Sequence, residues 1–307
     1  MISSFFKKSG VFSYLLSIAL LFVAVYSQGE IEGNFFRLDF QQNIAFLVLC
    51  LCMLAVDWMV KQHYWATKAN HHLLFFPLFI FVIPIEVWDN WVLFFFFFLW
   101  IAFSYLIAID PSGGNIAKVF NAFFFYFVGC LIFPQGIVFF PFLWVVLIMK
   151  GAFNIRFVLI SLLPILALFL LEVIIVSFIP QTILIPSVSF SKLVFSFPWE
   201  PVLRLNLWWV IMMIILLFSV LKHYIDMGTK SAAYGAGMKS LFALAVSALL
   251  FGLFFQTQSS FSWVVFLMAL TALSTRLFED IRRSWLRSLL LFCIIGLLLL
   301  GKYGLPF

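Results

Sequence analysis

Glu172 is the clearest candidate for chemistry, because its carboxyl group interrupts the apolar run "LFLLEVIIVSF". An ionisable side chain inside hydrocarbon is costly, and such side chains are usually paired or functional. Two roles stay open for Glu172. A protonated or hydrogen-bonded carboxyl group could lock one helix against another, or it could bind and release a proton in a transport cycle.

A second carboxyl group, that of Asp57, precedes Lys61 by four residues. Residues at this spacing lie on one face of a helix, so we expect the two side chains to pair as an anchor near the end of their helix. Two adjacent histidines, His71 and His72, cannot both point to one helical face, and no acidic residue or cysteine stands at ligand spacing from them. The sequence therefore predicts no metal site and no cofactor.

The elements that position these groups follow from composition. Hydrophobic residues make up 65% of the 307 residues, charged residues only 10%, and the mean hydropathy is +1.18. A chain with so little polar surface is typical of a membrane protein. No charge-rich block is long enough to form a separate soluble domain, so residues 1–307 are predicted to be a single integral membrane domain.

Apolar runs predict an all-α fold, a polytopic transmembrane helix bundle of about eleven spans. A helix needs about 20 apolar residues to cross the hydrocarbon, and somewhat fewer when its ends are flanked by snorkelling side chains. The predicted spans are roughly 11–27, 42–60, 73–88, 90–109, 118–133, 135–149, 157–179, 207–221, 240–256, 262–275 and 288–301.

The basic residues orient this bundle. With the end that carries Lys7 and Lys8 in the cytoplasm, fourteen of the eighteen Lys and Arg residues fall on the inner side. Such an asymmetry is what the positive-inside rule describes. The N-terminus is therefore predicted to be cytoplasmic and the C-terminus to lie outside. The net charge of +6 then reflects orientation, and we expect no nucleic-acid partner.

Irregular and polar sequence collects on the predicted outer side. The loop at 28–43 carries three acidic residues and an arginine, and "IPIEVWDNW" forms a turn between the third and fourth spans. The segment 180–206 alternates apolar residues with serines and is broken by prolines, which suits a stretch lying on the membrane interface. It could cap a cavity, dock a partner or serve as a loop without a ligand. The candidate residues for binding a substrate or partner are Arg37, Glu86, Asp89, Glu172, Lys192, Trp199 and Arg204.

The sequence lacks the motifs that are typical of several function classes. It has no glycine-rich phosphate loop, no GxSxG elbow, no HExxH and no regular array of arginines. ATPase, hydrolase and voltage-sensor functions are therefore not expected. A secondary transporter usually has repeated halves with broken helices at matching positions, and no matching pair is found.

Four short motifs of the chain are similar to those of a known protein family. The opening "MISSFF", the "PIEVWDN" turn, "AKVFNAFFFYF" and "FPQG" together resemble an uncharacterised family of multispanning inner-membrane proteins from Bacteroidota. The resemblance covers essentially the whole chain in order and length. It implies a multi-pass protein of the bacterial inner (cytoplasmic) membrane and no activity, and in that membrane the predicted topology places the C-terminus on the periplasmic side.

A looser architectural likeness covers residues 118–171, which are similar to the middle of polytopic glycosyltransferases that use polyprenyl-phosphate sugars. This likeness implies a catalytic carboxylate in the first outer loop, where Glu30, Glu32 and Asp39 lie. A cationic grip on the phosphate would come from outer Arg and Lys residues. The short first loop and the lack of a large outer domain after the last span depart from that pattern.

Three functions are carried forward. The leading expectation is a non-enzymatic subunit of a cell-envelope complex for protein secretion or surface assembly, which docks membrane protein partners through its helices and outer loops. The first alternative is a glycosyltransferase-like protein acting on a lipid-linked substrate at the periplasmic face. The second is a proton-coupled transporter that uses Glu172.

Overall fold

The computed structural model describes the greater part of the chain and leaves several connections out. The described residues are 10–26, 40–62, 70–82, 90–109, 115–152, 154–178, 207–226, 232–254, 259–279, 281 and 283–303. Within them every regular element is helical.

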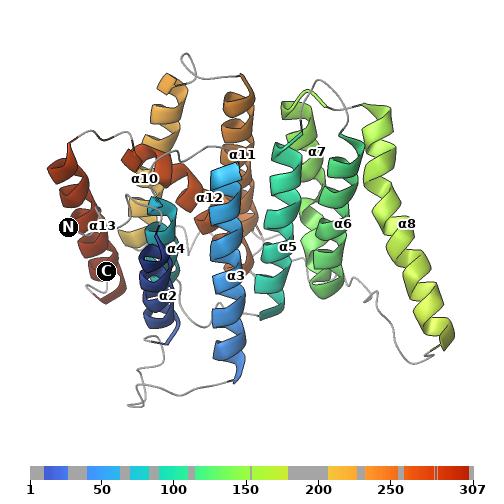
Figure 1. The fold of residues 1–307 in the computed structure, drawn as a ribbon, viewed down its shortest axis with the longest axis horizontal. Coiled ribbons are helices and arrows are strands. Elements are labelled where there is room, and N and C mark those ends of the chain that lie inside the picture. The colour runs from blue at the N-terminus through green and yellow to red at the C-terminus, as the bar shows by residue number, and fades with distance from the viewer. Residues whose placement is uncertain are drawn as a thin grey trace. The chain divides into compact units, whose positions relative to one another are not determined.

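Eleven α-helices and one 3-10 helix make up the described chain (Figure 1). Each of the eleven predicted segments contains an α-helix, so the expected all-α fold and its helix positions are confirmed. The elements are α2 (Val11–Tyr26), α3 (Phe40–Gln62), α4 (His71–Val82), α5 (Asn90–Ile107), α6 (Ile116–Ile132), η3 (Pro134–Phe139), α7 (Phe140–Met149), α8 (Ile155–Phe178), α10 (Leu207–Asp226), α11 (Ala232–Phe254), α12 (Ser259–Glu279) and α13 (Ser284–Tyr303).

One predicted segment, 135–149, is divided into two elements. Its first part is the 3-10 helix η3, which begins at Pro134, and the α-helix α7 begins only at Phe140, with a proline in its first turn. Proline suits the first turn of a helix but disrupts its interior, so two prolines at this spacing favour two short elements.

Two of the described helices, α3 and α5, are long and apolar enough to cross a membrane. The composition of the whole chain, with 65% hydrophobic and 10% charged residues, is the stronger indication of a membrane protein.

The chain divides into two compact units, Met1–Asn90 with Phe195–Phe307, and Trp91–Val194. We call them unit 1 and unit 2 and describe each by itself. The prediction of a single domain stays a prediction.

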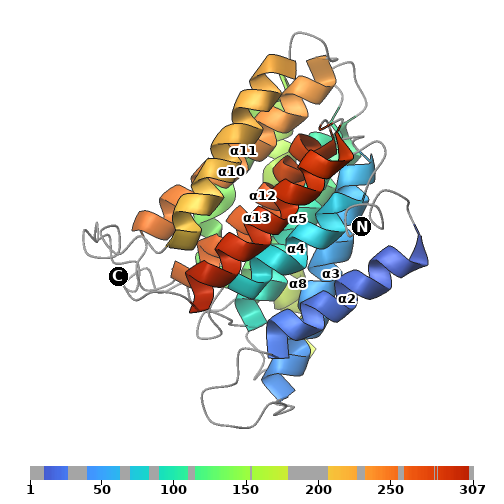
Figure 2. The ribbon, with the colours of Figure 1, turned by 90° about the vertical axis from the view of Figure 1, so that its left-hand side faces the viewer.

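The helix α12 forms the centre of unit 1, packing against α4, α10 and α11 (Figure 2). Every residue from Val265 to Thr275 is buried, as expected for a helix that is covered on all sides. Its hydroxyl groups are satisfied within the helix, since Thr271 donates to the carbonyl of Leu267 at 2.7 Å. Such bonds allow polar side chains to be buried without a partner on another helix.

Phe95 of α5 is central to unit 2. Its ring is fully buried and lies 5.9 Å from the ring of Phe133 and 6.1 Å from that of Tyr126, measured between centroids. Gly136 makes this packing possible, because a Cβ atom there would lie 2.2 Å from the Phe95 ring. Tyr126 donates to the Gly136 carbonyl at 2.8 Å and fixes η3 against α6.

The helix α8 packs on α6 through a single stripe of residues. Ile160, Ser161, Pro164 and Leu168 are buried, while most of the side chains described between them are exposed. Asn154 caps the start of the helix, accepting a hydrogen bond from the Phe157 backbone N–H at 2.9 Å.

Candidate functional site

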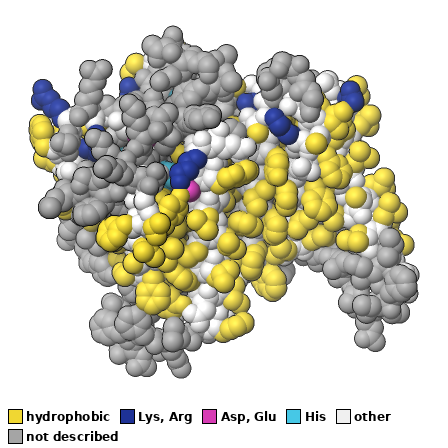
Figure 3. All heavy atoms as spheres, in the orientation of Figure 1, with side chains coloured by type: hydrophobic (Ala, Val, Ile, Leu, Met, Phe, Trp, Pro, Cys, Tyr) yellow, Lys and Arg dark blue, Asp and Glu magenta, His cyan; other side chains and the backbone are white. Residues whose placement is uncertain are grey.

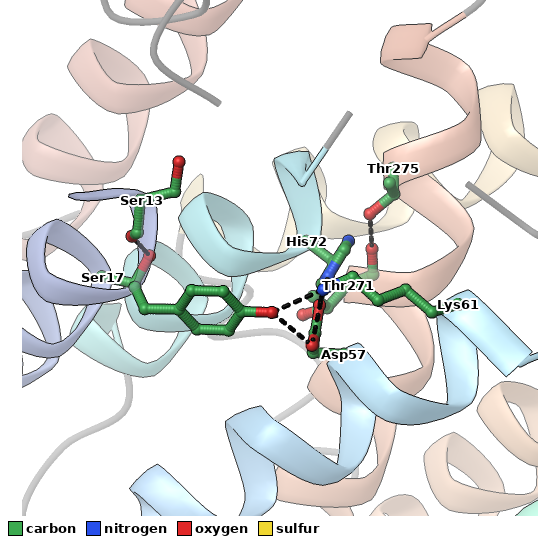
Figure 4. A network of polar contacts seen from close by, with 8 residues as sticks. Ser13, Ser17, Asp57, Lys61, His72, Thr271 and Thr275 are labelled. Carbon is green, nitrogen blue, oxygen red and sulfur yellow. Dashed lines mark hydrogen bonds and ion pairs between the residues drawn. The ribbon is translucent and has the colours of Figure 1, made fainter. Parts of the chain in front are cut away.

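Three polar side chains surround a buried carboxyl group in unit 1, that of Asp57 (Figure 4). Asp57 accepts hydrogen bonds from the Tyr14 hydroxyl at 2.8 Å and from Lys61 Nζ at 2.9 Å, both on Oδ2. Its other oxygen, Oδ1, lies 2.6 Å from His72 Nε2 and 2.8 Å from Lys61 Nζ. Lys61 also donates to the Tyr14 hydroxyl. We call these four residues the Asp57 cluster.

Each residue of the cluster stands near a helix end. Tyr14 lies in the first turn of α2, Asp57 and Lys61 lie in the last two turns of α3, and His72 lies in the first turn of α4. The predicted topology places all three of these ends on the cytoplasmic side. The chain therefore brings the four side chains together by packing successive antiparallel helices.

Burial is uneven across the cluster. The exposed fraction is 1% for His72 and 7% for Asp57, whereas the side chain of Lys61 is 40% exposed. The cluster thus reaches the surface through Lys61 and ends in the interior at His72.

With Asp57 ionised, the hydrogen on His72 Nε2 follows from which atoms can donate. An Asp57 carboxylate can only accept, so His72 Nε2 must donate its hydrogen to Oδ1. With His72 neutral, the Asp57 carboxylate and the Lys61 ammonium group cancel.

The start of α4 and the residue before it leave polar atoms unpaired among the described residues. His72 Nδ1, His71 Nε2 and Asn70 Nδ2 are all buried and have no hydrogen-bond partner there. Most buried polar atoms in proteins are paired, so three such atoms in one turn call for an explanation. Next to this turn lies α12, whose Thr271 and Thr275 hydroxyls donate to carbonyls of their own helix.

The sequence prediction of an Asp57–Lys61 pair is confirmed. Glu172 lies within α8, but its side chain is outside the description. The remaining predicted site residues lie outside the described residues, as does the whole segment 180–206. These are Glu30, Glu32, Arg37, Asp39, Glu86, Asp89, Lys192, Trp199 and Arg204.

Sequence reasoning missed Tyr14 and His72. It tested the two adjacent histidines only as metal ligands, and it treated the Asp57 pair as a local anchor. The topology itself contained a usable signal, because it placed Tyr14, Asp57 and His72 at the same side of three consecutive helices. Among the described residues, no group of three His, Cys, Asp or Glu side chains is arranged to hold a metal ion.

No known protein family, no curated protein and no solved structure matches this chain. The family resemblance drawn from its motifs therefore stays a prediction. The function has to be argued from the geometry of the chain itself.

Proposed function

We propose that the chain is a multi-pass protein of the bacterial inner membrane, with about eleven spans, a cytoplasmic N-terminus and a periplasmic C-terminus. Its composition supports this, as do the helices found at all eleven predicted positions. Among the fourteen cations that set this orientation, Lys118, Lys150 and Arg156 lie at ends of helices of unit 2.

The function that the geometry supports best is proton-coupled transport, with the proton bound at the Asp57 cluster. The observation that carries this proposal is the contact between a buried carboxylate and a fully buried histidine whose second ring nitrogen has no partner among the described residues. Ionisable side chains inside a membrane protein mark proton relays and transport pathways. This assigns the proton to Asp57 and His72 rather than to Glu172.

Proton uptake at this cluster has a structural consequence. With His72 neutral, the cluster has no net charge, and an additional proton would give it one positive charge. Lys61 could then turn its ammonium group to water and leave Asp57 paired with a protonated His72, so proton binding would change which side chains hold the Asp57 carboxylate. Because α4 packs against α12, proton binding would bias the packing of these two helices and so couple the proton to a movement in unit 1.

A pH-jump experiment on reconstituted protein tests this function without knowing the solute. Proteoliposomes adsorbed to a solid-supported membrane are exposed to rapid changes of pH, and the transient current reports charge displaced by proton binding. We expect currents from the wild type and from Glu172→Gln, and none from His72→Gln, which removes the imidazole. Equal currents from the wild type and His72→Gln would refute the assignment, and a loss confined to Glu172→Gln would return the proton site to α8.

A second candidate function is the envelope-complex subunit. One observation favours it: the later half of α8 exposes large apolar side chains, including Phe169 and Leu170 at 53% and 52% exposure. A neighbouring membrane protein could pack there. The test is purification in mild detergent with identification of co-purifying proteins, comparing the wild type with Phe169→Ala/Leu170→Ala, and recovery of a lone monomer would exclude this function.

The glycosyltransferase alternative depends on residues outside the description. Its test is a series of carboxylate-to-amide variants at Glu30, Glu32 and Asp39, assayed for envelope glycan. Normal glycan in all three variants would exclude it.

A further inference from the structure

A groove in unit 2 combines an apolar floor with a charged end. Its volume is about 810 Å³, and it is lined by Ile116 of α6 and by α8 side chains that include Arg156, Leu159, Leu163 and Leu166. Both helices belong to unit 2, and α6 is the helix against which α8 packs. Arg156 is the only charged residue that lines the groove among the described residues.

The positive charge at the end of the groove has no negatively charged partner among the described residues. Arg156 is exposed, and no hydrogen bond or ion pair to it is found among the described residues. Lys118 donates to the Ala108 carbonyl at 2.6 Å, and Lys150 is buried at the end of α7. No acidic side chain is described in this unit. In the part of Figure 3 that shows α5 to α8, the Lys and Arg side chains gather along one edge, above a broad apolar surface.

The apolar floor has the length of one membrane leaflet. From Ile155 to Leu166 the helix rises by about 16 Å, at about 1.5 Å per residue. Half of a bilayer's hydrocarbon core is about 15 Å thick. A chain lying in the groove with its charged head at Arg156 would therefore extend from the cytoplasmic interface toward the middle of the bilayer.

We propose that this groove binds an anionic phospholipid of the cytoplasmic leaflet, with an acyl chain along Leu159, Leu163 and Leu166 and the headgroup phosphate at Arg156. Arg presents a planar fork of donors that suits phosphate oxygens. Arg156 also stands in the first turn of α8, where the helix dipole favours an anion. The proposal rests on the membrane location but not on the proton step.

The lining side chains favour a lipid over a second helix as the occupant. Helices in membranes associate closely through Gly, Ala and Ser, which let their backbones approach. The groove is lined instead by branched Leu and Ile side chains that are about half exposed, such as Leu159 at 59% and Leu163 at 48%. A flexible acyl chain can fill the spaces between such side chains, while a regular helix surface leaves gaps there.

Native mass spectrometry of the full chain tests the site. The detergent-solubilised protein is titrated with phosphatidylglycerol or with phosphatidylcholine that has the same acyl chains, and the fraction of protein retaining one lipid is measured. One surface cation is worth about fivefold in binding an anionic lipid. We therefore expect phosphatidylglycerol to bind about fivefold more tightly than phosphatidylcholine, and Arg156→Gln to remove that difference.

Two further variants make the result specific. Arg283→Gln removes an exposed cation of unit 1, between α12 and α13, and should leave the preference for phosphatidylglycerol unchanged. Leu163→Trp fills the groove and should weaken retention of both lipids. Equal retention of the two lipids by the wild type would mean nonspecific annular lipid only. A preference that survives Arg156→Gln would place the anionic site elsewhere, and either result would overturn the proposal.

Discussion

Replacing Asp57 by alanine should destabilise unit 1 chiefly through His72. Lys61 is 40% exposed at its side chain and can turn its ammonium group to water, and Tyr14 is also partly exposed. His72 is 1% exposed and would lose its hydrogen-bond partner at Nε2, while Nδ1 already lacks one among the described residues. A buried polar group left unsatisfied costs about 1–3 kcal/mol, so we expect a loss of about 2 kcal/mol in the free energy of unfolding.

A double-mutant cycle measures this mechanism. Unfolding by sodium dodecyl sulfate in mixed micelles gives free energies for the wild type, Asp57→Ala, His72→Leu and the double variant. Because His72→Leu removes the group that Asp57→Ala leaves unpaired, the double variant should lose at least about 1 kcal/mol less than the sum of the single losses. Lys61→Arg, which keeps a cation beside Asp57, is the control, and it should change stability by under about 1 kcal/mol. Additive losses, or a Lys61→Arg loss as large as that of Asp57→Ala, would refute the reasoning.

Further predictions concern Tyr14 and the packing of unit 2. Tyr14→Phe removes one hydrogen bond to a carboxylate and should lower the free energy of unfolding by about 1 kcal/mol, measured in the same assay; no loss in this variant would mean that Lys61 and His72 satisfy Asp57 alone. Gly136→Ala places a Cβ atom against the buried ring of Phe95 and should cost about 1–3 kcal/mol. Gly296→Ala, where nothing lies within 4 Å, should leave the melting temperature unchanged or raise it, and equal effects of the two alanines would show that the Phe95 contact is not tight.

The helices could be predicted from the sequence because apolar runs of this length have few other stable conformations. Their ends could not, since helices such as α11 (Ala232–Phe254) begin before the apolar run of residues 240–256 that predicted them. Hydropathy reports where side chains prefer hydrocarbon, while a helix continues for as long as its backbone hydrogen bonds are favourable. Predicting the division of 135–149 into η3 and α7 also requires the rule that proline suits the first turn of a helix and disrupts its interior.

In the candidate site, the contact between residues close in the sequence could be predicted, and the contacts between distant residues could not. The Asp57–Lys61 pair was predictable because four residues along a helix fix the geometry. Tyr14 and His72 were not identified, because they lie 43 and 15 residues from Asp57 and reach it only through helix packing. The predicted outer carboxylates lie in connections outside the described residues, so their role stays a prediction.

The position of the Asp57 cluster limits what it can do in a transport cycle. In the topology that we propose, the helix ends that carry the cluster face the cytoplasm, so the proposed proton site lies near that side and needs a second element to connect it with the periplasm. Within unit 1, α12 packs against α4, and the turn of α12 that carries Thr271 and Thr275 lies beside His72 (Figure 4). If this turn forms part of the path, Thr271→Val should slow the current relaxation after a pH jump without changing the total charge displaced, because it alters the path and not the site. An unchanged relaxation rate would place the path away from α12.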